Sequence, residues 1–232
     1  MLPKVIDPCP IIDAIVELRF EPTVEADAVF GILYNIFKES YPKLLKLPIL
    51  QLPEAFRQEK DLMYQPHYKM MNDRFAFQVG PRAITVSCLD KYVGWTDFYN
   101  EIKSCVTKIE GANLIGEYQR LGIRYINFFT INIFEKIQLQ LNGADMKSDF
   151  SSLRTEKSVG KLKCILQVNN HVTIQRQTER ITGSVIDIDI VALYNPELFK
   201  DVVSLIDDAH TQEKQTFFDL IGDFVLELNP KY

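Results

Sequence analysis

Apolar and polar residues alternate along a short segment near the start of the chain. From Ala14 to Phe20 one side of the alternation is apolar, and the other side carries Glu17 and Arg19. A period of two is typical of a strand with one buried and one polar face. The run from Tyr118 to Thr130 is also strand-like and has Arg124 in its middle. We therefore expect two long strands, each with an arginine on its polar face.

Helical spacing of apolar residues follows the first strand between Val29 and Phe37, with Thr23 as N-cap and Pro42 as the end. A second helix is predicted from Thr96 to Ile109. In the second half of the chain the pattern predicts helical segments over 134–141, 196–206 and 208–224.

Short β-rich runs separated by turn residues complete the pattern. The first half has them at 68–71, 75–79 and 83–89, and the second half at 162–168, 172–177 and 184–193. Asn169-Asn170 and Thr182-Gly183 are the turns expected between the last three. The proline-rich segment 42–66 and the polar segment 142–160 are expected to be loops.

The same order of elements thus occurs twice, and it predicts an α+β fold. We expect tandem β-α-β-β-β-α repeats over 1–112 and 113–232, fused into one compact unit with one curved antiparallel sheet and its helices on one face. This order resembles the TATA-binding-protein-like and helix-grip folds. It also predicts that the two long strands pair at the centre, which brings Arg19 and Arg124 close together with carboxylates between them.

Composition narrows the function. The 232 residues are 47% hydrophobic with a net charge of -5, which disfavours nucleic acid and anionic membranes as main partners. Cys9, Cys88, Cys105 and Cys164 lack metal or redox spacing and are expected to be reduced and buried. With no signal peptide and no long apolar run, the sequence predicts a cytoplasmic protein, and we expect it to be prokaryotic.

Asp187 and Asp189 are the other candidate site residues on a predicted strand. At positions i and i+2 they face the same way, roughly 7 Å apart. They would serve as an acid–base or cation-binding pair, lie on a solvated strand face, or be partners of Arg19 and Arg124 in a structural ion-pair network with Glu17. A solvated face or an arginine partner is the more common outcome. Gln175 is expected on the same open face.

Trp95 stands in an aromatic cluster at a strand-to-helix junction, where it either fixes the helix on the sheet or forms the wall of a ligand pocket at the edge of the open face. His67, His171 and His210 are isolated, and His210 is expected to be a hydrogen-bonded helix residue. The sequence carries no known catalytic, metal or cofactor motif, so we expect no cofactor and assign no catalytic residue.

Three stretches resemble a known family: the N-terminal P-x-I-I-D-A-I-V-E-L-R-F, the aromatic cluster around Trp95, and L-G-I-R-Y-I-N from Leu121 to Asn127. They are similar to an uncharacterised, sporadically distributed prokaryotic family of about this length. Members of that family have no assigned activity, and the resemblance implies a gene of the kind carried on mobile or defence-associated islands.

These features favour a non-catalytic binding or interaction protein whose partner is another protein or a second copy of the chain. A first alternative is an enzyme or binder of a small anionic ligand that uses Arg19 and Arg124 as clamps. A second alternative is nucleic-acid binding, which Asp187 and Asp189 oppose by repelling phosphate.

Overall fold

The computed structural model describes residues 2–137, 150–176 and 179–232. Its strands are β1 (Ile11–Pro22), β2 (Lys43–Lys46), β3 (Tyr68–Met71), β4 (Phe75–Val79), β5 (Ala83–Cys88), β6 (Ile115–Phe129), β7 (Ser152–Val159), β8 (Leu162–Arg176) and β9 (Glu179–Leu193). Its α-helices are α1 (Ala28–Phe37), α2 (Glu54–Arg57), α3 (Trp95–Gly111) and α4 (Val202–Ile221). Short 3₁₀ segments are η1 (Pro48–Gln51), η2 (Ile133–Glu135), η3 (Leu198–Lys200) and η4 (Gly222–Leu228).

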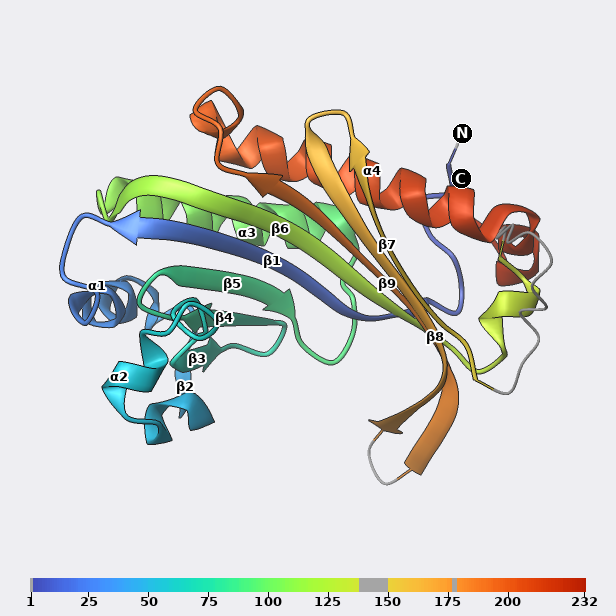
Figure 1. The fold of residues 1–232 in the computed structure, drawn as a ribbon, viewed down its shortest axis with the longest axis horizontal. Coiled ribbons are helices and arrows are strands. Elements are labelled where there is room, and N and C mark those ends of the chain that lie inside the picture. Colours follow the sequence, from blue (N-terminus) through green and yellow to red (C-terminus); the bar gives the residue numbers. More distant parts are fainter. Residues whose placement is uncertain (1, 138–149, 177–178) are drawn as a thin grey trace.

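All nine strands of this described part belong to one antiparallel sheet in the order β2-β3-β4-β5-β1-β6-β9-β8-β7 (Figure 1). The α+β class and the single large sheet were predicted correctly. The three strands predicted in the first half correspond to β3, β4 and β5 within a residue.

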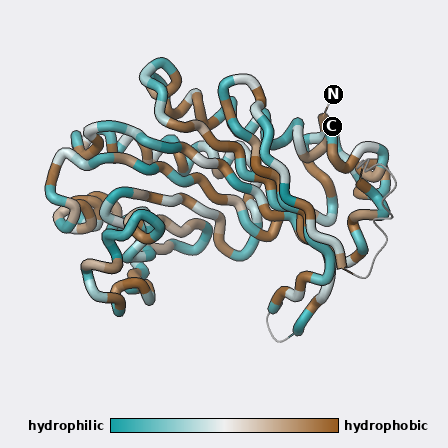
Figure 2. Tube along the Cα trace, viewed as in Figure 1, coloured by the Kyte–Doolittle hydropathy of each residue, from teal (hydrophilic) through white to brown (hydrophobic). Residues whose placement is uncertain are grey.

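The antiparallel pair β1–β6 forms the centre of the sheet. Val16 lies opposite Ile123, and Leu18 lies opposite Leu121. These four side chains are buried, whereas Glu17 on the alternate face is not. Figure 2 shows the resulting alternation of apolar and polar positions along both strands. The pattern of the sequence thus sets one apolar face and one polar face across the middle of the molecule.

Helices α3 and α4 cover the apolar face. Each turns a stripe of buried residues toward the sheet, including Ile102 of α3 and Ile206 of α4. The two helices are also tied to each other, because Tyr99 donates a hydrogen bond to the carbonyl of Val203 over 3.4 Å. Burying apolar stripes at about 25 cal/mol per Å² is the main force that holds this layer to the sheet.

Helix α1 packs beside α3 on the same side. The ring of Phe37 lies 4.3 Å from that of Phe77 on β4, and Tyr41 donates to Glu101 of α3 over 2.5 Å. The expected N-cap was wrong. The helix begins at Ala28, and the Thr23 hydroxyl donates to the Asn113 carbonyl instead, so it joins the ends of β1 and α3.

The second half departs from the predicted turns. Residues 162–176 form one strand, and Asn169-Asn170 lies at a bulge where His171 has a φ of 55°. The predicted loop 142–160 contains strand β7, and part of that loop lies outside the described residues, as does the end of the predicted 134–141 helix. Residues with left-handed propensity serve a bulge as readily as a turn, which explains the misassignment.

Gly183 lies inside β9 rather than in a turn. A Cβ atom at this position would stand 2.1 Å from the backbone oxygen of Phe129 and 2.7 Å from the ring of Phe128. The absence of a side chain therefore lets β9 cross the end of β6 at close range.

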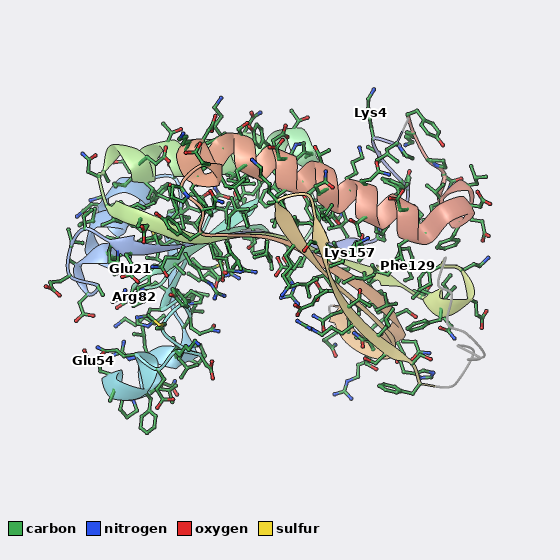
Figure 3. All side chains as sticks on the ribbon, turned by 45° about the horizontal axis from the view of Figure 1, so that its top comes forward. Lys4, Glu21, Glu54, Arg82, Phe129 and Lys157 are labelled. Atoms are coloured by element: carbon green, nitrogen blue, oxygen red, sulfur yellow. The ribbon has the colours of Figure 1, made fainter. Side chains whose placement is uncertain are left out.

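Two segments project from the sheet on the side away from α4 (Figures 1 and 3). The first, here called the insertion, is Lys43–His67; it was expected to be a loop but contains β2, η1 and α2. Glu54, labelled in Figure 3, marks its α2. The second, the distal hairpin, pairs Val172–Arg176 with Glu179–Gly183 beyond the end of β6.

Two of the four cysteines differ from expectation. Cys105 and Cys164 are buried, but Cys88 is half-buried and Cys9 is exposed, and all four are free thiols. In the described residues no helix has the length and apolarity needed to cross a membrane.

A pair of glycine substitutions tests the strand crossing. We expect Gly183→Ala to lower the free energy of unfolding by about 1–3 kcal/mol, because the added methyl group forces β9 away from Phe129. Gly31→Ala, in an exposed part of α1 with nothing within 4 Å of the added atom, should instead raise it by about 0.5–1 kcal/mol. Urea unfolding of both variants makes the comparison, and a stabilised Gly183→Ala would contradict the crossing.

Candidate functional site

The predicted arginines lie on the polar face of the two central strands. Arg19 on β1 is directly opposite Arg120 on β6, and Arg124 is opposite Ile15. Arg19 and Arg124 are therefore on adjacent strands and on one face, as the sequence predicted. Asp187 and Asp189 face them from β9, where Asp189 pairs with Arg124 and Asp187 pairs with Ile126.

Arg120 links the three central strands. Its guanidinium donates to Glu17 Oε1 over 2.5 Å and to Asp189 Oδ2 over 2.8 Å. Glu17 also accepts from Arg19 Nε at 2.7 Å, so one carboxylate separates two arginines. We expected carboxylates between Arg19 and Arg124. Glu17 instead lies between Arg19 and Arg120, and Arg124 pairs separately with Asp187, so the residue at the centre is Arg120. Sequence reasoning missed it, although it stands at i and i+4 with Arg124 on the same strand face.

Gly122 makes room for this arrangement. A Cβ atom there would lie 2.5 Å from Arg120 Nη1 and 3.0 Å from its Cζ. The guanidinium thus occupies the space that a side chain at position 122 would take, and from there it reaches Glu17 on β1 and Asp189 on β9 at the same time. A glycine between two arginines in the R-L-G-I-R run was the available signal for this packing.

Arg124 forms a separate bidentate pair with Asp187. Its Nε and Nη2 donate to the two carboxylate oxygens over 2.8 and 2.6 Å. Asp187 is buried, whereas the Arg124 side chain is 43% exposed. The hydrogen bond and the charge of Asp187 raise the pKa of Arg124, so the arginine stays charged. Asp13 lies near this pair, and burial raises the pKa of its carboxyl.

The half-buried location of Asp189 on the polar face disfavours the charged form of its carboxyl. Burial raises its pKa above the usual value, and the charges of Arg120 and Arg124 oppose that rise. Both aspartates are thus held by arginines on the same face. This favours the structural ion-pair network over an acid–base pair, because each carboxylate already accepts charge-assisted hydrogen bonds.

At the far end of β1 the network continues to the insertion. The Arg19 guanidinium carbon lies 4.7 Å from the ring centre of Tyr64, and the Tyr64 hydroxyl donates to Gln119 over 3.2 Å. Gln119 donates to Glu21, which also pairs with Arg82 of the β4–β5 turn (Figure 3). The insertion is therefore anchored on the polar face by a cation–π contact and a hydrogen bond.

Two predicted site residues lie elsewhere. Gln175 is in the distal hairpin opposite Arg180, whereas β6 already ends where Phe129 pairs with Ser184. Trp95 is on the helix side, where its ring stacks on His210 at 3.7 Å and its Nε1 donates to Asp207 over 3.0 Å. Trp95 thus ties α3 to α4, and it does not border the open polar face.

Comparison with known proteins adds no assignment. No protein-family model matches the chain, and no curated protein matches it. Among the residues that the structure describes, no group of three or more His, Cys, Asp or Glu side chains is placed to hold a metal ion.

The central role of Arg120 can be measured by urea unfolding. At pH 7 we expect Arg120→Met to cost about 2–3 kcal/mol, because the Arg120 side chain is only 18% exposed and its loss leaves Glu17 and Asp189 short of a partner. Arg19→Met and the exposed Arg74→Met should each cost under about 1 kcal/mol.

The cost should also depend on pH. Removing Arg120 raises the already elevated pKa of Asp189 further, and a raised carboxyl pKa takes stability away as pH rises. The loss in Arg120→Met should therefore shrink as pH falls toward about 4, where carboxyls take up protons. Equal, pH-independent costs for the three arginine variants would show that Arg120 is not the centre of the network.

Proposed function

We propose that this protein is a non-catalytic binding module that engages another protein through the insertion and the adjoining polar face of the sheet. The observation that carries this proposal is the apolar surface of the insertion. Four large side chains there are solvent-exposed within a short stretch: Leu44, Leu45, Leu52 and Phe56. Exposed apolar side chains that gather on one projecting segment are typical of protein-binding surfaces.

Strand β2 gives this surface a second means of binding. It is the last strand on its side of the sheet, and all four of its residues are exposed. An edge strand offers unpaired backbone donors and acceptors to an extended segment of a partner. Lys43 and Lys46 flank the apolar pair Leu44-Leu45, and such edge lysines oppose indiscriminate aggregation.

We further propose that residues 1–112 and 113–232 are two copies of one β-α-β-β-β-α unit, of the TATA-binding-protein-like kind. In support, the strands from the centre outward run β1-β5-β4-β3 on one side and β6-β9-β8-β7 on the other. Each set is followed in the chain by a long helix, α3 or α4. Tandem duplication would explain why β1 and β6 are neighbours, since their pairing removes two open edges.

The polar face favours a protein partner over the alternatives. Anion clamping by Arg19 and Arg124 would require displacing Glu17 and Asp187, which already hold them. A nucleic acid would meet three carboxylates, Glu17, Asp187 and Asp189, on the same face. A protein surface with mixed charges need not displace these carboxylates, and it does not approach them with negative charge alone. From the family resemblance we propose that the partner is cytoplasmic, prokaryotic and encoded in the same mobile or defence-associated locus.

Affinity capture tests the binding surface. Tagged wild-type protein, incubated with lysate of the source organism, should retain a specific partner identified by mass spectrometry. We expect Leu52→Ser/Phe56→Ser to reduce its recovery at least about tenfold, because exposed anchors contribute on the order of 1–2 kcal/mol each to an interface. If the partner is a second copy, light scattering should show a dimer that the double variant dissociates.

Leu226→Ser is the matched control. Leu226 is 67% exposed but lies in η4 near the C-terminus, away from the insertion. Its recovery of partner should equal that of the wild type. Capture of no specific partner together with a strictly monomeric wild-type protein, or equal recovery by all three proteins, would overturn the proposal.

A further inference from the structure

A cavity of about 310 Å³ lies on the helix side of the sheet. It is enclosed by the N-terminal segment, the loop before α3, strand β6 and helix α4. Trp95, Phe217 and Phe218 supply aromatic wall, and apolar atoms dominate the lining. A cavity of this size lies at the lower end of the range used for small-molecule binding.

Three polar side chains of this cavity lack a hydrogen-bond partner among the described residues: the buried Glu213 and Asn127 and, at its buried Nδ1 atom, His210, which was expected to be hydrogen-bonded. Glu213 is 5% exposed and Asn127 is 2% exposed. Among the described residues, neither side chain forms a hydrogen bond or an ion pair, although buried polar groups are nearly always paired. A carboxyl and an amide left unpaired in one cavity indicate a place for a polar group from outside the chain.

The interior carries no full charge near neutral pH. Burial raises the pKa of Glu213 to about 8, so its carboxyl is mostly protonated and can donate a hydrogen bond. Burial also lowers the pKa of His210 to about 3, so that imidazole is neutral. The hydroxyls of Tyr92 and Tyr125 satisfy each other over 3.2 Å.

Two lysines of the lining carry positive charge: Lys214 is half-buried, and Lys4 is exposed. Lys4 and Lys214 are close enough to repel each other, which contributes to the lowered pKa of Lys214 after the larger effect of burial. Within the described residues neither ammonium belongs to an ion pair. In a protein with a net charge of -5, an unpaired pair of lysines at an apolar cavity is an attractive site for a single anionic group.

We propose that this cavity binds a small monocarboxylic acid with an apolar aromatic or aliphatic body. The body fills the aromatic cavity, and the carboxylate accepts hydrogen bonds from the protonated Glu213 and the Asn127 amide while Lys214 and Lys4 balance its charge. Lys214 follows Glu213 directly on α4, and the two side chains interact electrostatically, so one head group can engage both. A cationic ligand would meet two ammonium groups. The site faces away from the polar face and does not depend on the proposed protein partner.

Trp95 provides the readout, because it is the single tryptophan of the chain and lines the cavity. Its fluorescence is titrated at pH 7 with two matched sets: phenylacetate, phenylacetamide and phenethylamine, and octanoate, octanamide and octylamine. We expect saturable changes with the carboxylates, binding at least about tenfold tighter than the amides, and the weakest binding for the amines. Lys214→Met should weaken carboxylate binding about tenfold, and Lys103→Met, an exposed lysine of α3, should leave it unchanged.

Proton linkage gives a second, independent measurement. Carboxylate affinity should fall about tenfold between pH 7 and 9 as Glu213 ionises and repels the ligand, and Glu213→Gln should remove that fall. The other titratable groups facing the site are Lys4, Cys9, Tyr92, Tyr125, His210 and Lys214. Burial raises the pKa of Cys9, Tyr92 and Tyr125 above their ordinary values, so they stay neutral over most of this range.

Several results would overturn the proposal. One is the absence of a saturable signal from either carboxylate, both by fluorescence and by ligand-observed NMR. Another is binding of the amides as tight as that of the carboxylates. A third is an equal effect of Lys214→Met and Lys103→Met on carboxylate binding. Circular dichroism of each variant establishes that it is folded, and Lys4→Met replaces Lys214→Met if that variant is not. Persistence of the pH dependence in Glu213→Gln would equally count against the assigned role of the carboxyl.

Discussion

The antiparallel pairing of β1 with β6 is the constraint on which the remaining structure depends. Its register places Val16, Leu18 and Ile123 on one face and Glu17, Arg19 and Arg120 on the other. A slip of one residue would move every charge into the core, so the register is fixed by the cost of burying ions. The apolar face then requires a helical cover, which α3 and α4 supply.

Charges on the polar face are arranged to satisfy one another. Glu17 lies between Arg19 and Arg120, and Asp187 is held by Arg124 through two hydrogen bonds. Such a network contributes modestly to stability, since desolvation offsets most of the attraction. Its larger effect is on geometry, because Arg120 joins β1 to β9 across β6. It thereby fixes the three central strands, which lie between the insertion and the distal hairpin.

Features that depend on the period of apolar residues along the chain could be predicted from the sequence. Predictions failed where one residue type suits two different local structures. Alternation located β1 with Glu17 and Arg19, β6 with Arg124, and the part of β9 that carries Asp187 and Asp189. Gly183 was misread because a glycine suits both a turn and a close strand crossing, and only the position of Phe129 distinguishes them. The turn predicted at Asn169-Asn170 was wrong for a similar reason, because residues with left-handed propensity suit a bulge as well as a turn. Of the two interpretations of Trp95, the one that put it at the edge of the open face was wrong, because no local pattern reveals that α4 packs over it.

The polar side chains on the two faces of the sheet differ in how far other groups of the protein satisfy them. On the polar face each of Arg19, Arg120 and Arg124 has a carboxylate partner, so little free energy is available to an incoming ion. On the helix side Glu213 and Asn127 are buried and have no partner among the described residues, which costs folding free energy that a hydrogen-bonding ligand would return. Evolution removes such costs readily by replacing the polar residue with an apolar one. A buried carboxyl in a largely apolar cavity is therefore better explained by what it binds than by what it stabilises.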